Sequence, residues 1–157
     1  MTQEIADEIK KLVELSIIDL GGIGGTLAGN ALSLAAMRAT LTQVLTEGNF
    51  QQMIELGNRW CDGVEAAIKE FGLPWHVNRL GARGEYLFQG HAARTGGEAA
   101  RAGDFELEQY IHLRLLNDGF LLTPFHNMAL MSPYTTAADV DAHTQAFRAM
   151  CQELVKN

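Results

Sequence analysis

Apolar residues recur three and four positions apart over much of the chain, which is the spacing of one face of a helix. The pattern covers residues 2–13, 31–47, 49–71, 105–117 and 137–154. The last four stretches each begin beside a side chain that can cap a helix, namely Asn30, Asn49, Asp104 and Thr136. Gly72 follows the longest stretch, and Pro74 prevents that helix from resuming. The pattern therefore predicts five helices.

Short aromatic and β-branched segments lie between the predicted helices. Residues 75–80 and 85–88 are joined by Gly81-Ala82-Arg83-Gly84, which predicts two strands with Arg83 in the turn. Two further brief strands are predicted at 120–122 and 128–131. The stretch 89–103 holds four glycines and no apolar period, so we expect a mobile loop there. Strand pairs split by one helix favour an α+β fold, with a small, mostly antiparallel sheet and helices on one face.

Composition narrows the classes of function. The chain of 157 residues carries 12 Lys and Arg against 19 Asp and Glu, a formal charge of −7 without a basic run, so we expect no nucleic acid partner. Its apolar runs are too short for a membrane span, and we expect no membrane partner. Cys61 and Cys151 lie within helical patterns, which predicts small core residues of a protein in a reducing compartment, the cytoplasm.

The most distinctive stretch is Gly21–Asn30, which has five glycines in ten positions directly ahead of a predicted helix. Glycines leave backbone N–H groups unshielded, Thr26 adds a hydroxyl donor, and a helix N-terminus carries partial positive charge. The stretch predicts a phosphate site. A flexible linker between two helices remains an equal alternative from the glycines alone.

Two common phosphate motifs fit this stretch poorly. A P-loop requires Lys followed by Ser or Thr after its last glycine, whereas Leu27 follows Thr26 here. A dinucleotide fingerprint finds its first two glycines at Gly22 and Gly24, but its third falls at Leu27. A degenerate dinucleotide-binding domain is therefore kept as an alternative.

Residues 24–36 resemble the G-T-x-x-G-N-P-L-x-x-A-A segment of class III pyridoxal-phosphate enzymes, most closely glutamate-1-semialdehyde aminomutases and related aminotransferases. The resemblance continues through 72–74, 119–124 and 136–141, and so covers nearly the whole chain. Ala31 stands where the family has proline, a small departure because proline at the first helical position is helpful but not required.

The resemblance implies the C-terminal part of an enzyme of fold type I that transfers amino groups on a small amino acid or keto compound. It implies three parts: residues 1–30 as the end of a large cofactor-binding domain, 31–48 as a connecting helix and 49–157 as the small C-terminal domain. It also implies that Gly25 and Thr26 contact the phosphate of pyridoxal 5′-phosphate held by the neighbouring subunit of a homodimer.

Amino-group transfer on pyridoxal phosphate requires a lysine that forms a Schiff base with the cofactor. The four lysines, Lys10, Lys11, Lys69 and Lys156, are ordinary solvated positions, and the resemblance implies that the family's lysine lies upstream of this segment. We therefore expect this chain alone to be an inactive fragment. A non-catalytic dimerisation or ligand-binding α+β module is the alternative from another class.

Candidate substrate residues are few. The region where many family members carry an arginine for the substrate carboxylate, residues 124–129, has none. Arg83 could supply a bidentate carboxylate contact, and His126 and Asn127 lie in a polar break between strands. The other histidines share no face and no metal-ligand spacing, so no metal is assigned.

Overall fold

The computed structural model describes residues 3–4, 7, 29–123 and 126–156. The expected N-terminal helix is almost entirely outside the described residues, as are Gly25 and Thr26. Contacts between Cα atoms divide the chain into two compact units, residues 1–42 and 43–157. Among the described residues, no helix combines the length and apolar character needed to cross a membrane.

Helix α2 (Ala31–Ala39) begins where the sequence predicts, because the Asn30 side chain accepts a hydrogen bond from the Ser33 amide at 3.0 Å. The predicted helix does not stay regular to residue 47. It continues as a π-helix, η1 (Thr40–Val44). The hydroxyls of Thr40 and Thr42 donate to backbone carbonyls four residues earlier, at 2.9 and 2.8 Å, and such bonds compete with the regular helical pattern.

Helix α3 (Glu47–Glu70) is the longest element, and it begins two residues earlier than expected. Thr46 is its N-cap, because the Thr46 hydroxyl accepts from the Asn49 amide at 3.3 Å. Asn49 instead donates its side-chain amide to the Val44 carbonyl at 2.6 Å. The predicted end is confirmed: Gly72 has a φ of 64°, a conformation that glycine adopts readily after a helix.

The sheet has three strands in the order β1 (His76–Leu80), β2 (Arg83–Leu87) and β3 (Met128–Leu130). Both pairs are antiparallel, which confirms the predicted fold class. Arg83 is the first residue of β2 and not a turn residue, because Gly81 and Ala82 alone make the connection and Leu80 pairs with Arg83. Within the described residues no parallel βαβ unit occurs, so nothing there favours the dinucleotide alternative.

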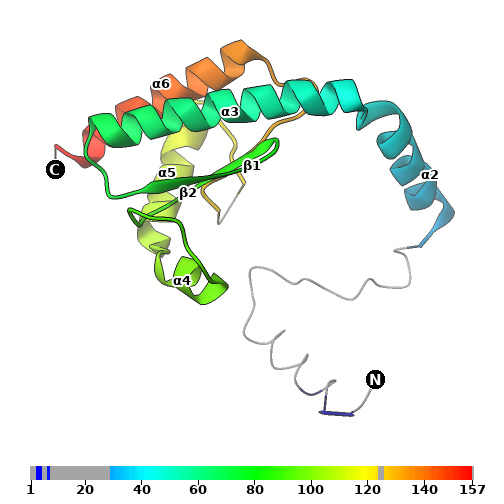
Figure 1. Ribbon diagram of the computed structural model, residues 1–157, viewed down its shortest axis with the longest axis horizontal. Helices are drawn as coiled ribbons and strands as arrows, with labels where there is room; N and C mark the ends of the chain where they lie inside the picture. Colours follow the sequence, from blue (N-terminus) through cyan, green and yellow to red (C-terminus); the bar gives the residue numbers. More distant parts are fainter. Residues whose placement is uncertain (1–2, 5–6, 8–28, 124–125, 157) are drawn as a thin grey trace. The chain divides into compact units, whose positions relative to one another are not determined.

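Helix α3 covers one face of the sheet, and α6 (Ala137–Leu154) runs parallel beside it (Figure 1). Close approach needs glycine at two points. A Cβ on Gly84 of β2 would lie 2.5 Å from the Cys61 sulfur, and one on Gly63 of α3 would lie 2.5 Å from the Thr144 hydroxyl. Glycine therefore lets α3 lie directly on the sheet and on α6.

The core between these layers is rich in aromatic side chains. Trp60, Tyr86 and Phe147 are fully buried, and the Tyr86 and Phe147 ring centroids lie 5.2 Å apart. Cys61 and Cys151 are buried free thiols, as predicted. The core therefore joins α3, β2 and α6 into one body.

Two predicted helix starts are confirmed. Asp104 caps α5 (Phe105–Asn117) by accepting from the Leu107 amide at 3.1 Å. Thr136 and Asp139 form a complete capping box at the start of α6. Helix α5 packs against α6.

Two local predictions are wrong. The expected loop at 89–103 contains helix α4 (Gly96–Arg101), because the Thr95 hydroxyl accepts from the Glu98 amide and caps it. The expected strand at 120–122 does not form. Phe120 and Leu122 pack against the core instead of pairing with a neighbouring strand.

Candidate functional site

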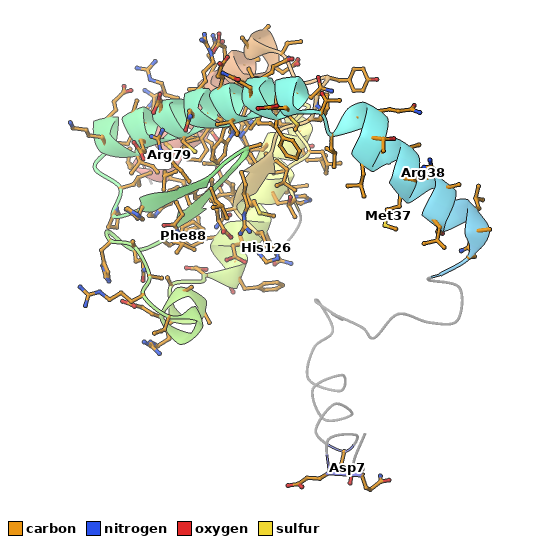
Figure 2. All side chains as sticks on the ribbon, turned by 45° about the vertical axis from the view of Figure 1, so that its right-hand side comes forward. Asp7, Met37, Arg38, Arg79, Phe88 and His126 are labelled. Atoms are coloured by element: carbon orange, nitrogen blue, oxygen red, sulfur yellow. The ribbon has the colours of Figure 1, made fainter. Side chains whose placement is uncertain are left out.

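Successive residues of β2 face opposite sides of the sheet. Gly84 and Tyr86 lie on the side that packs against α3, so Arg83 and Glu85 face the other side. A cavity of about 550 Å³ lies on that opposite face, between β2, the end of α4, the start of α5 and residues 126–127. Figure 2 shows His126 on this side, away from α3. The strand register thus brings charged groups from distant parts of the chain to one cavity.

All three predicted substrate residues line this cavity: Arg83, His126 and Asn127. The side chains of Arg83 and His126 are 43% and 47% exposed, so both are open to solvent. Asn127 is 8% exposed, and its backbone carbonyl accepts from the Tyr86 amide at 3.0 Å. The backbone of Asn127 is therefore fixed to β2, whereas the side chains of Arg83 and His126 are partly open to solvent.

Glu85 lies between Arg83 and His126. Its carboxylate accepts from Arg83 Nη2 at 2.7 Å, and its other oxygen lies 3.9 Å from His126 Nδ1. The Glu85 side chain is only 20% exposed, which strengthens these contacts relative to a fully solvated pair. A substrate carboxylate would have to replace Glu85 to form a bidentate contact with Arg83.

Glu108 of α5 adds a second carboxylate to the cavity wall. Burial raises its pKa above the ordinary value, nearby His126 lowers it, and Asp104 and Glu85 raise it further. Asp104 also lines the cavity, so three acidic side chains share it with one arginine. This arrangement suits a protonated amine better than a free carboxylate.

Sequence reasoning missed Glu85 and Glu108. A signal for Glu85 was present: Arg83 and Glu85 are two residues apart, so they share a face if both belong to a strand. Placing Arg83 in the turn concealed that relationship. Glu108 carries no local signal, because only the packing of α5 brings it to the sheet.

Other candidate chemistry is limited. No group of three His, Cys, Asp or Glu side chains within the described part of the chain is arranged to hold a metal ion. Lys69 and Lys156 are exposed. Of the glycine-rich stretch, Gly29 and Asn30 are described, and they lead directly into the N-terminus of α2, the end of a helix that favours anions.

Comparison with known proteins identifies relatives. No family model matches the chain. A glutamate-1-semialdehyde 2,1-aminomutase 2 of Halalkalibacterium halodurans is 33% identical over 131 residues, which are 80% of this chain and 30% of the relative. The chain thus spans about a third of the length of the curated relatives it matches.

Solved structures agree with the sequence comparison. A glutamate-1-semialdehyde aminomutase from Pseudomonas aeruginosa PAO1, in complex with PMP, is 49% identical with a TM-score of 0.77 over 97% of this chain and 34% of that one. A β-phenylalanine aminotransferase from Variovorax paradoxus, 24% identical with a TM-score of 0.70 over 84% of this chain and 30% of that one, shares the fold. The chain therefore belongs to the class III pyridoxal-phosphate-dependent aminotransferase family, and within it is similar to the glutamate-1-semialdehyde 2,1-aminomutases.

Proposed function

We propose that this chain is part of a pyridoxal-phosphate-dependent enzyme that transfers amino groups on a small amino acid or keto compound, as an aminotransferase or aminomutase. The observation that carries the proposal is the 49% identity, over 97% of the chain, to an aminomutase in complex with PMP. The two buried free thiols fit a reducing compartment, and we place the protein in the cytoplasm.

The proposed cofactor contact is Gly25 and Thr26, acting across a homodimer on the phosphate of the neighbouring subunit. When bound, pyridoxal phosphate supplies the electron sink that amino-group transfer needs. This chain supplies backbone N–H groups and the Thr26 hydroxyl, which together with the N-terminus of α2 favour a dianionic phosphate. Neither Lys69 nor Lys156 is proposed as catalytic, because both are exposed.

The proposed substrate end is the cavity with Arg83, His126 and Asn127. Arg83 is paired with Glu85, and Glu108 adds negative charge, so we propose that the cavity holds the amino group through Glu85 and Glu108. Arg83 then binds a substrate carboxylate only if that carboxylate displaces Glu85 from the guanidinium group.

The cofactor contact can be tested by titrating PMP into the ¹⁵N-labelled chain and following the backbone amide signals. We expect saturable shifts at Gly25 and Thr26, and their loss in Thr26→Val. Thr42→Val is a matched control, because the Thr42 hydroxyl donates to the Arg38 carbonyl of its own helix. Shifts confined to other residues, or none in the unaltered chain, would contradict the phosphate contact.

Catalytic incompetence of the chain alone needs a separate test. After incubation with pyridoxal phosphate and gel filtration, we expect the protein fraction to be colourless. A retained yellow band that hydroxylamine removes would show that one of the four lysines binds the cofactor, and peptide mass mapping would then identify it.

The substrate cavity can be probed with β-alanine, which has both an amino and a carboxylate group. We expect saturable shifts of the Glu85 and His126 signals, which Arg83→Gln weakens. Arg101→Gln changes an exposed arginine at the end of α4 and is the control. If the Arg83→Gln variant binds β-alanine as tightly as the unaltered chain, Arg83 does not contribute to substrate binding.

A further inference from the structure

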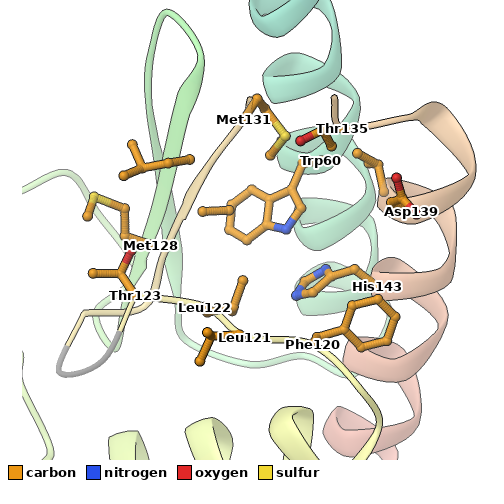
Figure 3. Close-up of a pocket in the computed structure, with 13 residues that line it drawn as sticks. Trp60, Phe120, Leu121, Leu122, Thr123, Met128, Met131, Thr135, Asp139 and His143 are labelled. Atoms are coloured by element: carbon orange, nitrogen blue, oxygen red, sulfur yellow. The ribbon is translucent and has the colours of Figure 1, made fainter. Parts of the chain in front are cut away.

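A second cavity, of about 420 Å³, lies between α3, α6 and β3 and is separate from the proposed substrate end. Most of its wall is apolar (Figure 3), and Met128 and Met131 in it have flexible side chains that adapt to irregular shapes. Leu121 and Leu130 are 74% and 61% exposed, so this part of the wall is open to solvent. The volume is within the range of roughly 300–1,000 Å³ that is typical of small-molecule pockets.

Two polar side chains that a ligand can reach line this cavity, Thr123 and Asp139, and Figure 3 shows them on opposite sides of it. Thr123 contributes an uncharged hydroxyl. Asp139 contributes a carboxylate at the start of α6. Its Oδ2 atom accepts hydrogen bonds from the Thr136 backbone amide at 2.8 Å and from the Thr136 hydroxyl at 2.7 Å. Because a carboxylate has two acceptor oxygens, Asp139 Oδ1 can still accept from a ligand.

Asp139 gives the wall its charge. The hydrogen bonds from Thr136 lower the Asp139 pKa, so this carboxyl is ionised at pH 7. Among the described residues, no lysine or arginine lines the cavity. His143 lines it, but burial lowers the His143 pKa to about 4, so the imidazole is neutral at pH 7. The nitrogens of Trp60 and His143 are covered by neighbouring atoms, so a ligand contacts these two rings and not their nitrogens.

This combination selects the charge of a ligand. The carboxylate attracts a single positive charge, and the net charge of −7 on the whole chain acts in the same direction. A second positive charge on the ligand would find no partner in the described part of the wall. A bare metal ion is also unsuited, because no group of three His, Cys, Asp or Glu side chains in the described ranges could hold one.

We propose that this cavity binds an apolar primary amine that carries one positive charge. The ammonium group donates a hydrogen bond to Asp139 Oδ1, and the apolar body lies against the methionine and leucine side chains. An alcohol of the same shape makes the same apolar contacts but forms no ion pair, and a carboxylate is repelled by Asp139. Nothing in this site depends on the cofactor chemistry or the substrate end proposed above.

The test uses the full chain with ¹³C-labelled methionine methyl groups, at pH 7 and low salt. The probes are benzylamine, benzyl alcohol and phenylacetate, which share a ring and differ in charge. Met131 lines this cavity and not the proposed substrate end, so its methyl signal reports on this site, and Met37 of α2 is an internal control. We expect benzylamine to shift the Met131 signal saturably. It should bind about fivefold more tightly than benzyl alcohol, the upper range for an exposed ion pair, and phenylacetate should bind most weakly.

Asp139→Asn removes the charge but keeps an oxygen that can accept from the Thr136 amide, so benzylamine should lose its advantage over benzyl alcohol. Glu55→Gln, at an exposed carboxylate of α3 outside the cavity, should keep that advantage. The proposal is overturned if benzylamine causes no saturable Met131 shift, if it binds the unaltered chain no more tightly than benzyl alcohol, or if Asp139→Asn keeps the advantage. The comparison of probes on the unaltered chain remains decisive even if Asp139→Asn does not fold.

Discussion

Arg59 of α3 holds Asp141 of α6 with two parallel hydrogen bonds, from Nε to Oδ1 at 2.6 Å and from Nη2 to Oδ2 at 2.8 Å. Arg148 of α6 makes the equivalent fork to Glu70 of α3, at 2.7 and 2.5 Å. In both pairs the hydrogen bonds from arginine hold the pKa of the carboxyl below its ordinary value. The two parallel helices above the sheet are thus joined at both ends of their contact.

Asp141→Asn should lower the thermal unfolding midpoint at low ionic strength, with a smaller difference in high salt, because exposed pairs are screened. The Asp141 pKa is lowered in the folded state, so the pair stabilises the fold above the ordinary aspartate pKa. That contribution is lost as the pH falls through the folded-state pKa. Glu55→Gln, at an exposed carboxylate of α3, is the control. A midpoint difference that does not depend on salt would rule out the ion pair as its cause.

Gly84→Ala should destabilise the fold by about 1–3 kcal/mol, because overpacking forces neighbouring groups apart. The added Cβ would lie 2.5 Å from the Cys61 sulfur and 2.7 Å from the Trp60 ring. Gly90→Ala has open space around the new Cβ and is the matched control. Urea unfolding of the two variants measures the difference, and equal midpoints would show that α3 does not lie against Gly84 as described.

His143 should make the protein less stable in acid. Burial lowers the His143 pKa to about 4 from an ordinary 6.5, so the unfolded state binds a proton first as the pH falls. Stability is lost between about pH 6.5 and 4, and the shift corresponds to roughly 3 kcal/mol at 1.36 kcal/mol per pKa unit. His143→Phe should flatten the pH dependence of the unfolding free energy over this window, whereas His91→Phe should not. The same slope in both variants would exclude His143 as the titrating group.

Thr136→Ala should reduce the unfolding free energy by about 1 kcal/mol, the usual effect of removing a threonine N-cap. The variant leaves the Asp139 amide without its side-chain acceptor at the start of α6. Gln145→Ala, at an exposed position within the same helix, should change stability by less than about 0.5 kcal/mol. Denaturant unfolding distinguishes the two, and equal effects would indicate that the capping box contributes nothing.

The sequence by itself determined the local features of this protein. Asn30, Asp104 and Thr136 mark helix starts and Gly72 a helix end, because capping depends on residues within one turn of each other. The family resemblance was also present in short, contiguous segments. The helix at 96–101 was missed although its signal, Thr95 three residues before Glu98, is local too.

Only the tertiary structure decided which distant side chains meet. The β1–β2 register turned Arg83 and Glu85 to one face, where α5 and residues 126–127 enclose them, and α3 packing on α6 brought Trp60 to His143. These encounters depend on strand register and on helix approach at Gly63 and Gly84, which no local pattern specifies, because contacts between residues far apart in sequence form only when the whole core packs.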